Sequence, residues 1–109
     1  MDLEFDDAKL QKCCESQKQM VRAYGPKTAN KLQARLNALR SLDVVADLWP
    51  LPGRWHVLTA DRAEHFAADL DHPYRLIVRP TAPIPRLPDD GIDWTRVRAV
   101  TVVEVCDYH

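Results

Sequence analysis

Three neighbouring residues near the C-terminal end of the sequence, Asp107, Tyr108 and His109, combine a carboxylate, a phenol and an imidazole. An imidazole titrates near neutral pH and can give or take a proton, and a neighbouring carboxylate can orient it. A second imidazole, His56, lies in an earlier run with the alternating pattern of a strand. Two imidazoles on different strands would form an acid–base pair that needs no metal. We therefore treat these four residues as candidate catalytic groups.

An acid–base pair of this kind suits RNA cleavage by the RNA's own 2′-hydroxyl. One group removes the 2′ proton, another protonates the leaving 5′ oxygen, and a cation stabilises the extra negative charge on the phosphate. Arg75 and Arg79 flank a short apolar run, and Arg62 lies in a turn, so these three arginines are the candidate cations. Each of them alone is also typical of a surface charge, and we expect His65 and His72 to be ordinary polar residues.

The composition is that of an ordinary globular protein. The chain has 109 residues, of which 46% are hydrophobic and 28% charged, which predicts one domain over residues 1–109. Three cysteines cannot all pair with one another, which favours reduced thiols and a cytoplasmic location. No apolar run approaches the roughly 20 residues of a membrane helix, and we expect no signal peptide. The sequence has neither a Cys-x-x-Cys pair nor a Walker-type glycine loop, so we expect no metal and no cofactor.

The charge of the chain is close to neutral. Its net charge is −1 and its isoelectric point is near 6.4, whereas phosphate contacts usually leave a basic footprint. Positive charge is concentrated in residues 21–47, where five Lys or Arg residues stand against two Asp residues, a net charge of +3. Such a stretch is typical of a solvated helix face. If the chain contacts RNA, we expect a local cluster or the help of a larger assembly.

The first half of the sequence predicts one strand and two helices. Leu3 and Phe5 alternate with acidic residues, as in a short strand with one buried side. Apolar residues then recur at helical spacing, which predicts one helix before Gly25 and a second after Pro26. Each helix has one apolar stripe and the connection is very short. We therefore expect an antiparallel helix hairpin over about residues 7–48 that packs on a sheet.

The second half of the sequence has the pattern of strands. Four short runs separated by turn residues predict a β-meander over about residues 54–109: 54–59, 65–70, 74–79 and 98–106. The last run is rich in valine, as in a central strand covered on both faces. A cluster of prolines makes 80–93 a stiff loop. The expected fold class is α+β: an N-terminal strand, then an antiparallel helix hairpin packed on a twisted antiparallel sheet.

Several stretches, taken in order along the whole chain, carry a family resemblance: Lys31-Leu32-Gln33-Ala34-Arg35-Leu36-Asn37-Ala38-Leu39, Leu51-Pro52-Gly53 running to His56, Leu58, Asp61-Arg62, Pro73-Tyr74-Arg75-Leu76-Ile77-Val78, Asp93-Trp94 and Val105-Cys106-Asp107-Tyr108-His109. The Asp-Tyr-His end with the upstream histidine is the most specific of them. Together they resemble the HigB branch of the RelE/ParE toxin superfamily, whose members are also called plasmid maintenance system killer proteins. The resemblance implies a fold of two helices against an antiparallel sheet.

The resemblance also implies a function. Proteins of this kind are toxins of type II toxin–antitoxin systems and ribosome-dependent endoribonucleases that cut mRNA in the decoding site. By resemblance, His56, Asp107, Tyr108 and His109 form the catalytic set and Arg75 contacts the scissile phosphate. The two imidazoles would transfer protons, in either order, and Asp107 would orient an imidazole or join the transfer. Tyr108 would stack on a base or help position the 2′-hydroxyl, or else fill the core.

The partners follow from the same resemblance. A HigA-type helix-turn-helix antitoxin would bind the protein, and operator DNA would be contacted only through that antitoxin. The ribosome would supply much of the binding of mRNA, which would reconcile RNA cleavage with a near-neutral chain. Within the chain, Arg62, Arg75 and Arg79 are the expected phosphate-binding residues.

The chain departs from the pattern of this family in two places that bear on activity. Many members of the family read Leu-Lys-Gly-Asp-Arg where this chain reads Leu58-Thr59-Ala60-Asp61-Arg62, so a cationic residue and a glycine are absent. The loop from Pro80 to Trp94 is also longer than in the smallest members, and resembles that of a longer-looped branch. A catalytically weak or inactive homologue that binds antitoxin as a co-repressor is therefore one alternative. A ParE-like gyrase inhibitor is another, although an inhibitor that acts by binding needs no acid–base pair.

Overall fold

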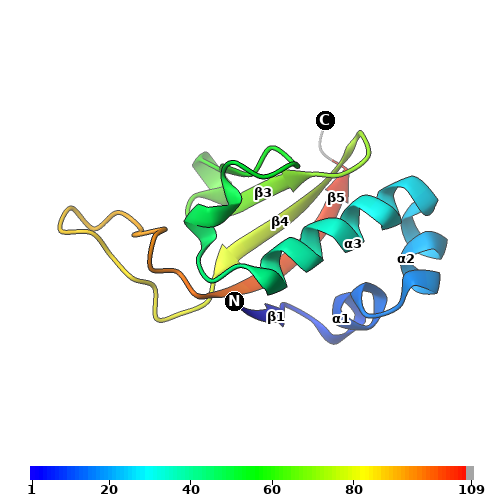
Figure 1. The fold of residues 1–109 in the computed structure, drawn as a ribbon, viewed down its shortest axis with the longest axis horizontal. Helices are drawn as coiled ribbons and strands as arrows, with labels where there is room; N and C mark the ends of the chain where they lie inside the picture. Colours follow the sequence, from blue (N-terminus) through cyan, green and yellow to red (C-terminus); the bar gives the residue numbers. More distant parts are fainter. Residues whose placement is uncertain (108–109) are drawn as a thin grey trace.

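The computed structural model describes residues 1–107. It is an α+β structure in which helices cover one face of a five-stranded sheet (Figure 1). Its helices and strands, in chain order, are β1 (Asp2–Phe5), α1 (Ala8–Cys14), α2 (Gln17–Tyr24), α3 (Pro26–Ser41), β2 (His56–Val57), β3 (Phe66–Asp69), β4 (Tyr74–Pro80) and β5 (Ala99–Asp107). The predicted α+β class is confirmed.

The first predicted helix is in fact two helices, which corrects the expected hairpin. The Oγ of Ser16 accepts a hydrogen bond from the Gln19 N–H at 3.2 Å and so caps the start of α2. Asp7 caps α1 in the same way, with its Oδ1 2.7 Å from the Leu10 nitrogen. Because a serine side chain competes for backbone N–H groups, one residue is enough to end one helix and begin the next.

The junction between α2 and α3 follows the sequence prediction. Gly25 adopts a φ of 86°, which costs a glycine little, and Pro26 is the first residue of α3. The end of α3 differs from the prediction, because the helix stops at Ser41 and a separate 3-10 turn follows at Val45–Leu48. Figure 1 shows α3 crossing the sheet diagonally, with α2 at its N-terminal end and α1 between β1 and α2.

The sheet has the strand order β1-β5-β4-β3-β2. β2, β3, β4 and β5 are antiparallel neighbours, but β1 pairs with β5 in parallel, with Asp2 opposite Ala99 and Phe5 opposite Val102. The predicted antiparallel meander is therefore confirmed for β2–β5, and the sheet as a whole is mixed because β1, whose direction was not predicted, joins it in parallel. An alternating pattern tells which side of a strand is buried but carries no information about strand direction.

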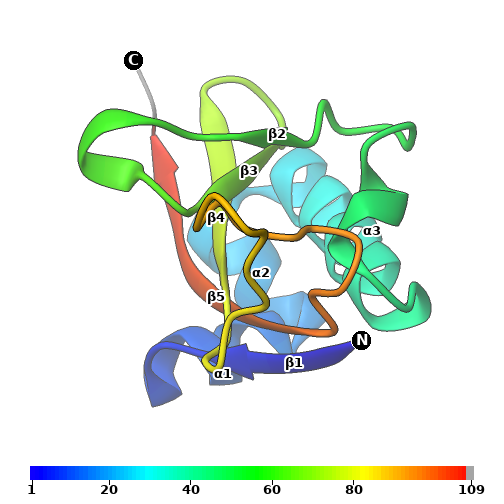
Figure 2. The same ribbon diagram turned by 90° about the vertical axis from the view of Figure 1, so that its left-hand side faces the viewer.

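One face of the sheet packs on α3 and forms the core; we call it the helix-side face. The buried stripe of α3 meets alternate residues of the strands, and all of these side chains are fully buried: Ala29, Leu32, Leu36 and Leu39 from α3, and Phe66, Leu76, Val78, Val100 and Val102 from the sheet. Figure 2 shows α3 to one side of β4 and β5. The opposite side of the sheet is the outer face.

A β-bulge in β5 decides which residues lie on the outer face. Val78 pairs with Val102, but Ile77 pairs with Glu104, so Val103 is an extra residue in β5. Past the bulge the alternation of β5 is inverted, because one inserted residue moves each later side chain to the other face. Glu104 and Cys106 consequently lie on the outer face, beside Ile77 and Arg75 of β4.

Residues 81–98 form an arm that projects from the end of the sheet (Figures 1 and 2). The arm contains an isolated bridge between Arg86 and Ile92 but no helix or strand, as expected for its prolines. Arg86 forms a two-pronged ion pair with Glu64, with nitrogen–oxygen distances of 2.5 and 3.1 Å. The arm is thereby tied to the segment between β2 and β3.

Candidate active site

His56 lies on the outer face at the edge of the sheet. It is opposite Ala67, which is opposite Ile77, which is opposite Glu104, so these four residues form one row across the strands. The preceding residue, Trp55, is buried on the other side with 5% exposure, as the alternation predicts. β2 itself is only two residues long, shorter than the predicted strand 54–59.

The ring of His56 is held in one tautomer. Its Nδ1 is 2.6 Å from the carbonyl oxygen of Arg54, and a carbonyl can only accept, so Nδ1 carries the hydrogen. In the neutral ring the lone pair is then on Nε2, which is the nitrogen able to take up a proton. This contact is local, because Arg54 lies only two residues before His56, in the turn that leads from Gly53 into β2.

Arg75 lies in the next row of the outer face, opposite Cys106 on one side and Asp69 on the other. Its Nε is 3.3 Å from Asp69 Oδ1, and the other oxygen, Oδ2, is 3.4 Å from Arg54 Nη1. One carboxylate therefore stands between two guanidinium groups. From ordinary strand spacing, the Cα atoms of Arg75 and His56 are roughly 12 Å apart, within reach of one substrate nucleotide.

Asp69 is itself fixed by its backbone. Its N–H donates to the Gly53 carbonyl at 2.7 Å, and its carbonyl accepts from Arg35 Nε at 3.0 Å. Arg35 comes from α3, and burial lowers the pKa of its guanidinium, although Asp69 opposes that shift. Gly53, with φ at 117°, lies against this arginine, because a Cβ there would come within 2.4 Å of Arg35 Nε. The helix thus anchors the strand end that carries Asp69.

Arg62 reaches the outer face from a 3-10 turn, Ala60–Arg62, between β2 and β3. Its guanidinium forms an ion pair with Glu104, the residue at the far end of the row of His56. Sequence reasoning did not single out Glu104 or Asp69. A signal for Glu104 was present, since it is the one acidic residue within the valine run of 98–106.

Arg79 lies apart from the other two predicted cations. It is on the outer face of β4 but four residues from Arg75, about 13 Å along the strand. It pairs with Asp6, at the end of β1, with Nη2 2.9 Å from Oδ1. The structure therefore brings Arg62 and Arg75 to the end of the sheet that holds His56, and places Arg79 near β1.

Asp107 is opposite Tyr74 in the register of β5 and β4. The ring of Tyr74 packs edge-on against Tyr24 of α2, with ring centroids 5.8 Å apart, so this register position belongs to the helix-side face. Alternation therefore puts Asp107 and its neighbour Cys106 on opposite faces. Tyr108 and His109 lie outside the described residues.

The thiol of Cys106 lies between the cationic groups of the site. Burial raises the pKa of this thiol, whereas the charges of Arg62 and Arg75 act in the opposite direction. Because the shift is upward, the thiol stays protonated at neutral pH and is a weak nucleophile. The ionic groups around it are of both signs, with Arg54, Arg62 and Arg75 beside Asp69 and Glu104, so most of the positive charge at this end is offset.

A polar pocket of about 280 Å³ opens beside this end of the sheet. It is lined mainly by Arg54, Asp69, His72, Tyr74 and Arg75. A second hollow, of about 260 Å³, lies between β5 and the first two helices and is lined largely by apolar side chains such as those of Leu10, Tyr24 and Val105. Only the first of the two includes a predicted site residue, Arg75.

Within residues 1–107, no group of three or more His, Cys, Asp or Glu side chains is arranged to hold a metal ion. In the same part of the chain, no helix combines the length and the apolar character needed to span a membrane.

Comparison with known proteins gave no relatives. No protein-family model, no curated protein and no solved structure matches the chain.

Proposed function

We propose that the protein is the toxin of a type II toxin–antitoxin system and that it cleaves mRNA on the ribosome as an endoribonuclease. The observation that carries the proposal is the shared outer face of His56 and Arg75. One is an imidazole whose Nδ1 is occupied by a backbone carbonyl, which leaves Nε2 for proton transfer, and the other is a cation on a neighbouring row. A base and a cation separated by roughly 12 Å between Cα atoms suit an RNA phosphate with its 2′-hydroxyl.

In the proposed reaction, Nε2 of His56 removes the proton of the 2′-hydroxyl. The 2′ oxygen attacks the adjacent phosphorus, and Arg75 stabilises the charge that builds on the phosphate oxygens. The imidazolium of His109 protonates the 5′ oxygen as its bond to phosphorus breaks. The products are a 2′,3′-cyclic phosphate and a free 5′-hydroxyl. Asp107 is on the opposite face of the sheet from His56, so it would orient the imidazole of His109, and Tyr108 would stack on a base or help position the 2′-hydroxyl.

The charge distribution supports a role for the ribosome. The net charge of the chain is −1, and the three predicted phosphate-binding arginines each lie against a carboxylate. Affinity for free RNA depends on unneutralised cations and falls steeply with salt. We therefore expect naked mRNA to be a poor substrate at physiological salt, and the decoding site to supply most of the binding.

The test is a short pulse of expression in a bacterial host without antitoxin, with mapping of mRNA 5′ ends. We expect cuts in phase with the reading frame for the wild type, and at least a hundredfold loss for His56→Ala and for His109→Ala, the usual range for an acid–base group. Val57→Ala, next to His56 and 44% exposed, is the matched control and should cut normally. Growth arrest without cuts would instead favour gyrase inhibition.

The same ion pairs favour a second candidate, a weak or inactive homologue that serves as co-repressor. Arg62 is neutralised by Glu104, Arg75 by Asp69 and Arg79 by Asp6. Such a protein would bind a HigA-type helix-turn-helix antitoxin and affect operator DNA only through it. Normal growth and intact mRNA in the expression test, together with tighter operator repression when both proteins are present, would support this candidate over the nuclease.

A further inference from the structure

The polar pocket at the end of the sheet contains an arginine and a histidine that the proposed reaction does not use. Arg54 lies in the turn between Gly53 and β2, and His72 lies in the turn between β3 and β4. Both line the pocket together with Arg75. Three cationic or hydrogen-bond-donating side chains thus reach one hollow from three separate segments of the chain.

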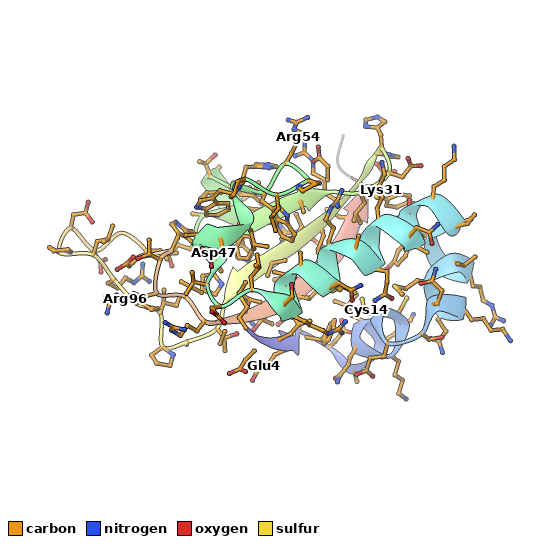
Figure 3. All side chains as sticks on the ribbon, in the orientation of Figure 1. Glu4, Cys14, Lys31, Asp47, Arg54 and Arg96 are labelled. Atoms are coloured by element: carbon orange, nitrogen blue, oxygen red, sulfur yellow. The ribbon has the colours of Figure 1, made fainter. Side chains whose placement is uncertain are left out.

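The turn at Arg54 directs its side chain away from the core. Arg54 adopts a φ of 51°, a left-handed conformation that is uncommon for a residue with a side chain. Its side chain is 77% exposed and extends outward at the end of the sheet where β5 ends (Figure 3). The arginine is nevertheless kept near the pocket, because Nη1 lies 3.4 Å from Asp69 Oδ2.

The walls of the pocket are held by contacts with α3. Arg35 hydrogen-bonds to the carbonyl of Asp69, and Lys31 forms an ion pair with Asp71 at 3.8 Å at the base of the turn that carries His72. Figure 3 shows Lys31 on the part of α3 that lies under this turn. The pocket is therefore formed by the turn between β3 and β4 and by the end of β3, and both are attached to α3 through these contacts.

The chemistry of the lining fits a phosphodiester. Guanidinium groups match the spacing of phosphate oxygens, and an imidazole N–H adds a third donor. The single carboxylate of Asp69 is shared by Arg54 and Arg75, and Asp71 is paired with Lys31, so the carboxylates offset only part of the positive charge of the two arginines. An apolar ligand would gain little here, because the pocket is lined mainly by polar side chains.

We propose that this pocket binds the backbone phosphate of mRNA next to the phosphate that is cleaved, through Arg54 and His72. Arg75 lines the pocket and also lies on the outer face, in the row of residues adjacent to the row of His56. It would therefore lie between the two phosphates. The identity of the ligand as mRNA rests on the proposed function. The pocket would then hold the strand in register while the ribosome supplies the remaining contacts.

The test measures binding separately from cleavage. The side-chain signals of Arg54, His72 and Arg75 are followed by NMR in low salt during titration with two probes. One probe is inorganic phosphate, and the other is a short single-stranded oligodeoxynucleotide, which has no 2′-hydroxyl and cannot be cut. The variants are Arg54→Ala, His72→Ala and, as the control, Arg40→Ala, an exposed arginine at the other end of α3.

We expect the oligodeoxynucleotide to shift all three signals in a saturable way. Arg54→Ala should weaken its binding about tenfold and His72→Ala about threefold, as for the loss of one charge-assisted or one ordinary hydrogen bond, and Arg40→Ala less than twofold. Absence of shifts, or equal binding by Arg54→Ala, would overturn the proposal. If the protein binds inorganic phosphate but does not bind the oligodeoxynucleotide, the assignment of the ligand as nucleic acid is overturned. Binding as expected by a protein that leaves mRNA intact in cells would uphold the pocket and reject the nuclease.

Discussion

The two halves of β5, residues 99–102 and residues 103–107, have different surroundings, although they belong to one continuous strand. Residues 99–102 lie between β1 and β4, and three consecutive side chains there, Val100, Thr101 and Val102, are buried. Past the bulge at Val103, the strand has β4 as its only strand neighbour within the described residues, and its side chains are partly exposed. One extra residue therefore separates a segment that stabilises the fold from one that presents ionic groups.

The largest expected effect comes from placing a charge in the first half of β5. Val102→Asp would bury a carboxylate with no cation beside it, so we expect the free energy of unfolding to fall by about 4 kcal/mol or more. Urea denaturation followed by circular dichroism measures this. Val57→Asp is the control, because Val57 is 44% exposed and its change should cost under about 0.5 kcal/mol. Equal stability of the two variants would mean that this half of β5 is not core.

Removing the bulge should change the second half of β5, past Val103. Deletion of Val103 would turn Glu104 and Cys106 to the helix-side face and separate Glu104 from Arg62. We expect mRNA cleavage to fall about a hundredfold or more, the usual result of a displaced site, and some stability to be lost as well.

A control deletion separates the two effects of removing Val103. Deletion of Asp89, in the turn of the arm, shortens the chain equally but leaves the register of β5 unchanged. Cleavage is measured by 5′-end mapping, and folding by circular dichroism. Full cleavage by a folded Val103 deletion would show that the outer face past the bulge has no part in the reaction.

The smallest expected effect comes from the ion pair between Glu104, in the second half of β5, and Arg62. Glu104→Gln removes the carboxylate that neutralises Arg62, so we expect cleavage to increase a few-fold at low salt, and less at high salt. Stability should change by under about 1 kcal/mol, because both side chains are partly exposed. The increase should vanish in the double variant Arg62→Ala with Glu104→Gln. An increase that persists there would assign the effect to a residue other than Arg62.

Local signals in the sequence predicted much of the fold. The Gly25-Pro26 pair correctly predicted a helix junction, since each residue suits one side of it. The valine run correctly predicted a strand that is central and buried over residues 100–102, and alternation put Trp55 and His56 on opposite sides. The split at Ser16 was missed because a serine inside a helical pattern is tolerated or becomes a cap depending on tertiary packing.

The candidate site was less predictable, because its geometry depends on pairings between distant segments. Arg62, Arg75 and Arg79 remain predicted phosphate-binding residues, but each is paired with a carboxylate from a distant segment of the chain: Glu104, Asp69 and Asp6, respectively. No pattern within one strand could show these pairs. The bulge was equally hidden, since Val102-Val103 reads as ordinary valine sequence, and yet it decides which face Glu104 and Cys106 occupy.

The parallel pairing of β1 with β5 has a consequence for how the protein is made. Asp2 lies opposite Ala99, 97 residues later, and the strand between β1 and β4 is the last of the five to be synthesised. Contacts between such distant segments form slowly, because a long loop must close before they are gained. During translation β1 therefore has no strand to pair with until β5 has left the ribosome. A nascent chain cannot complete its sheet, and so cannot assemble the outer face past the bulge, until synthesis has passed residue 107.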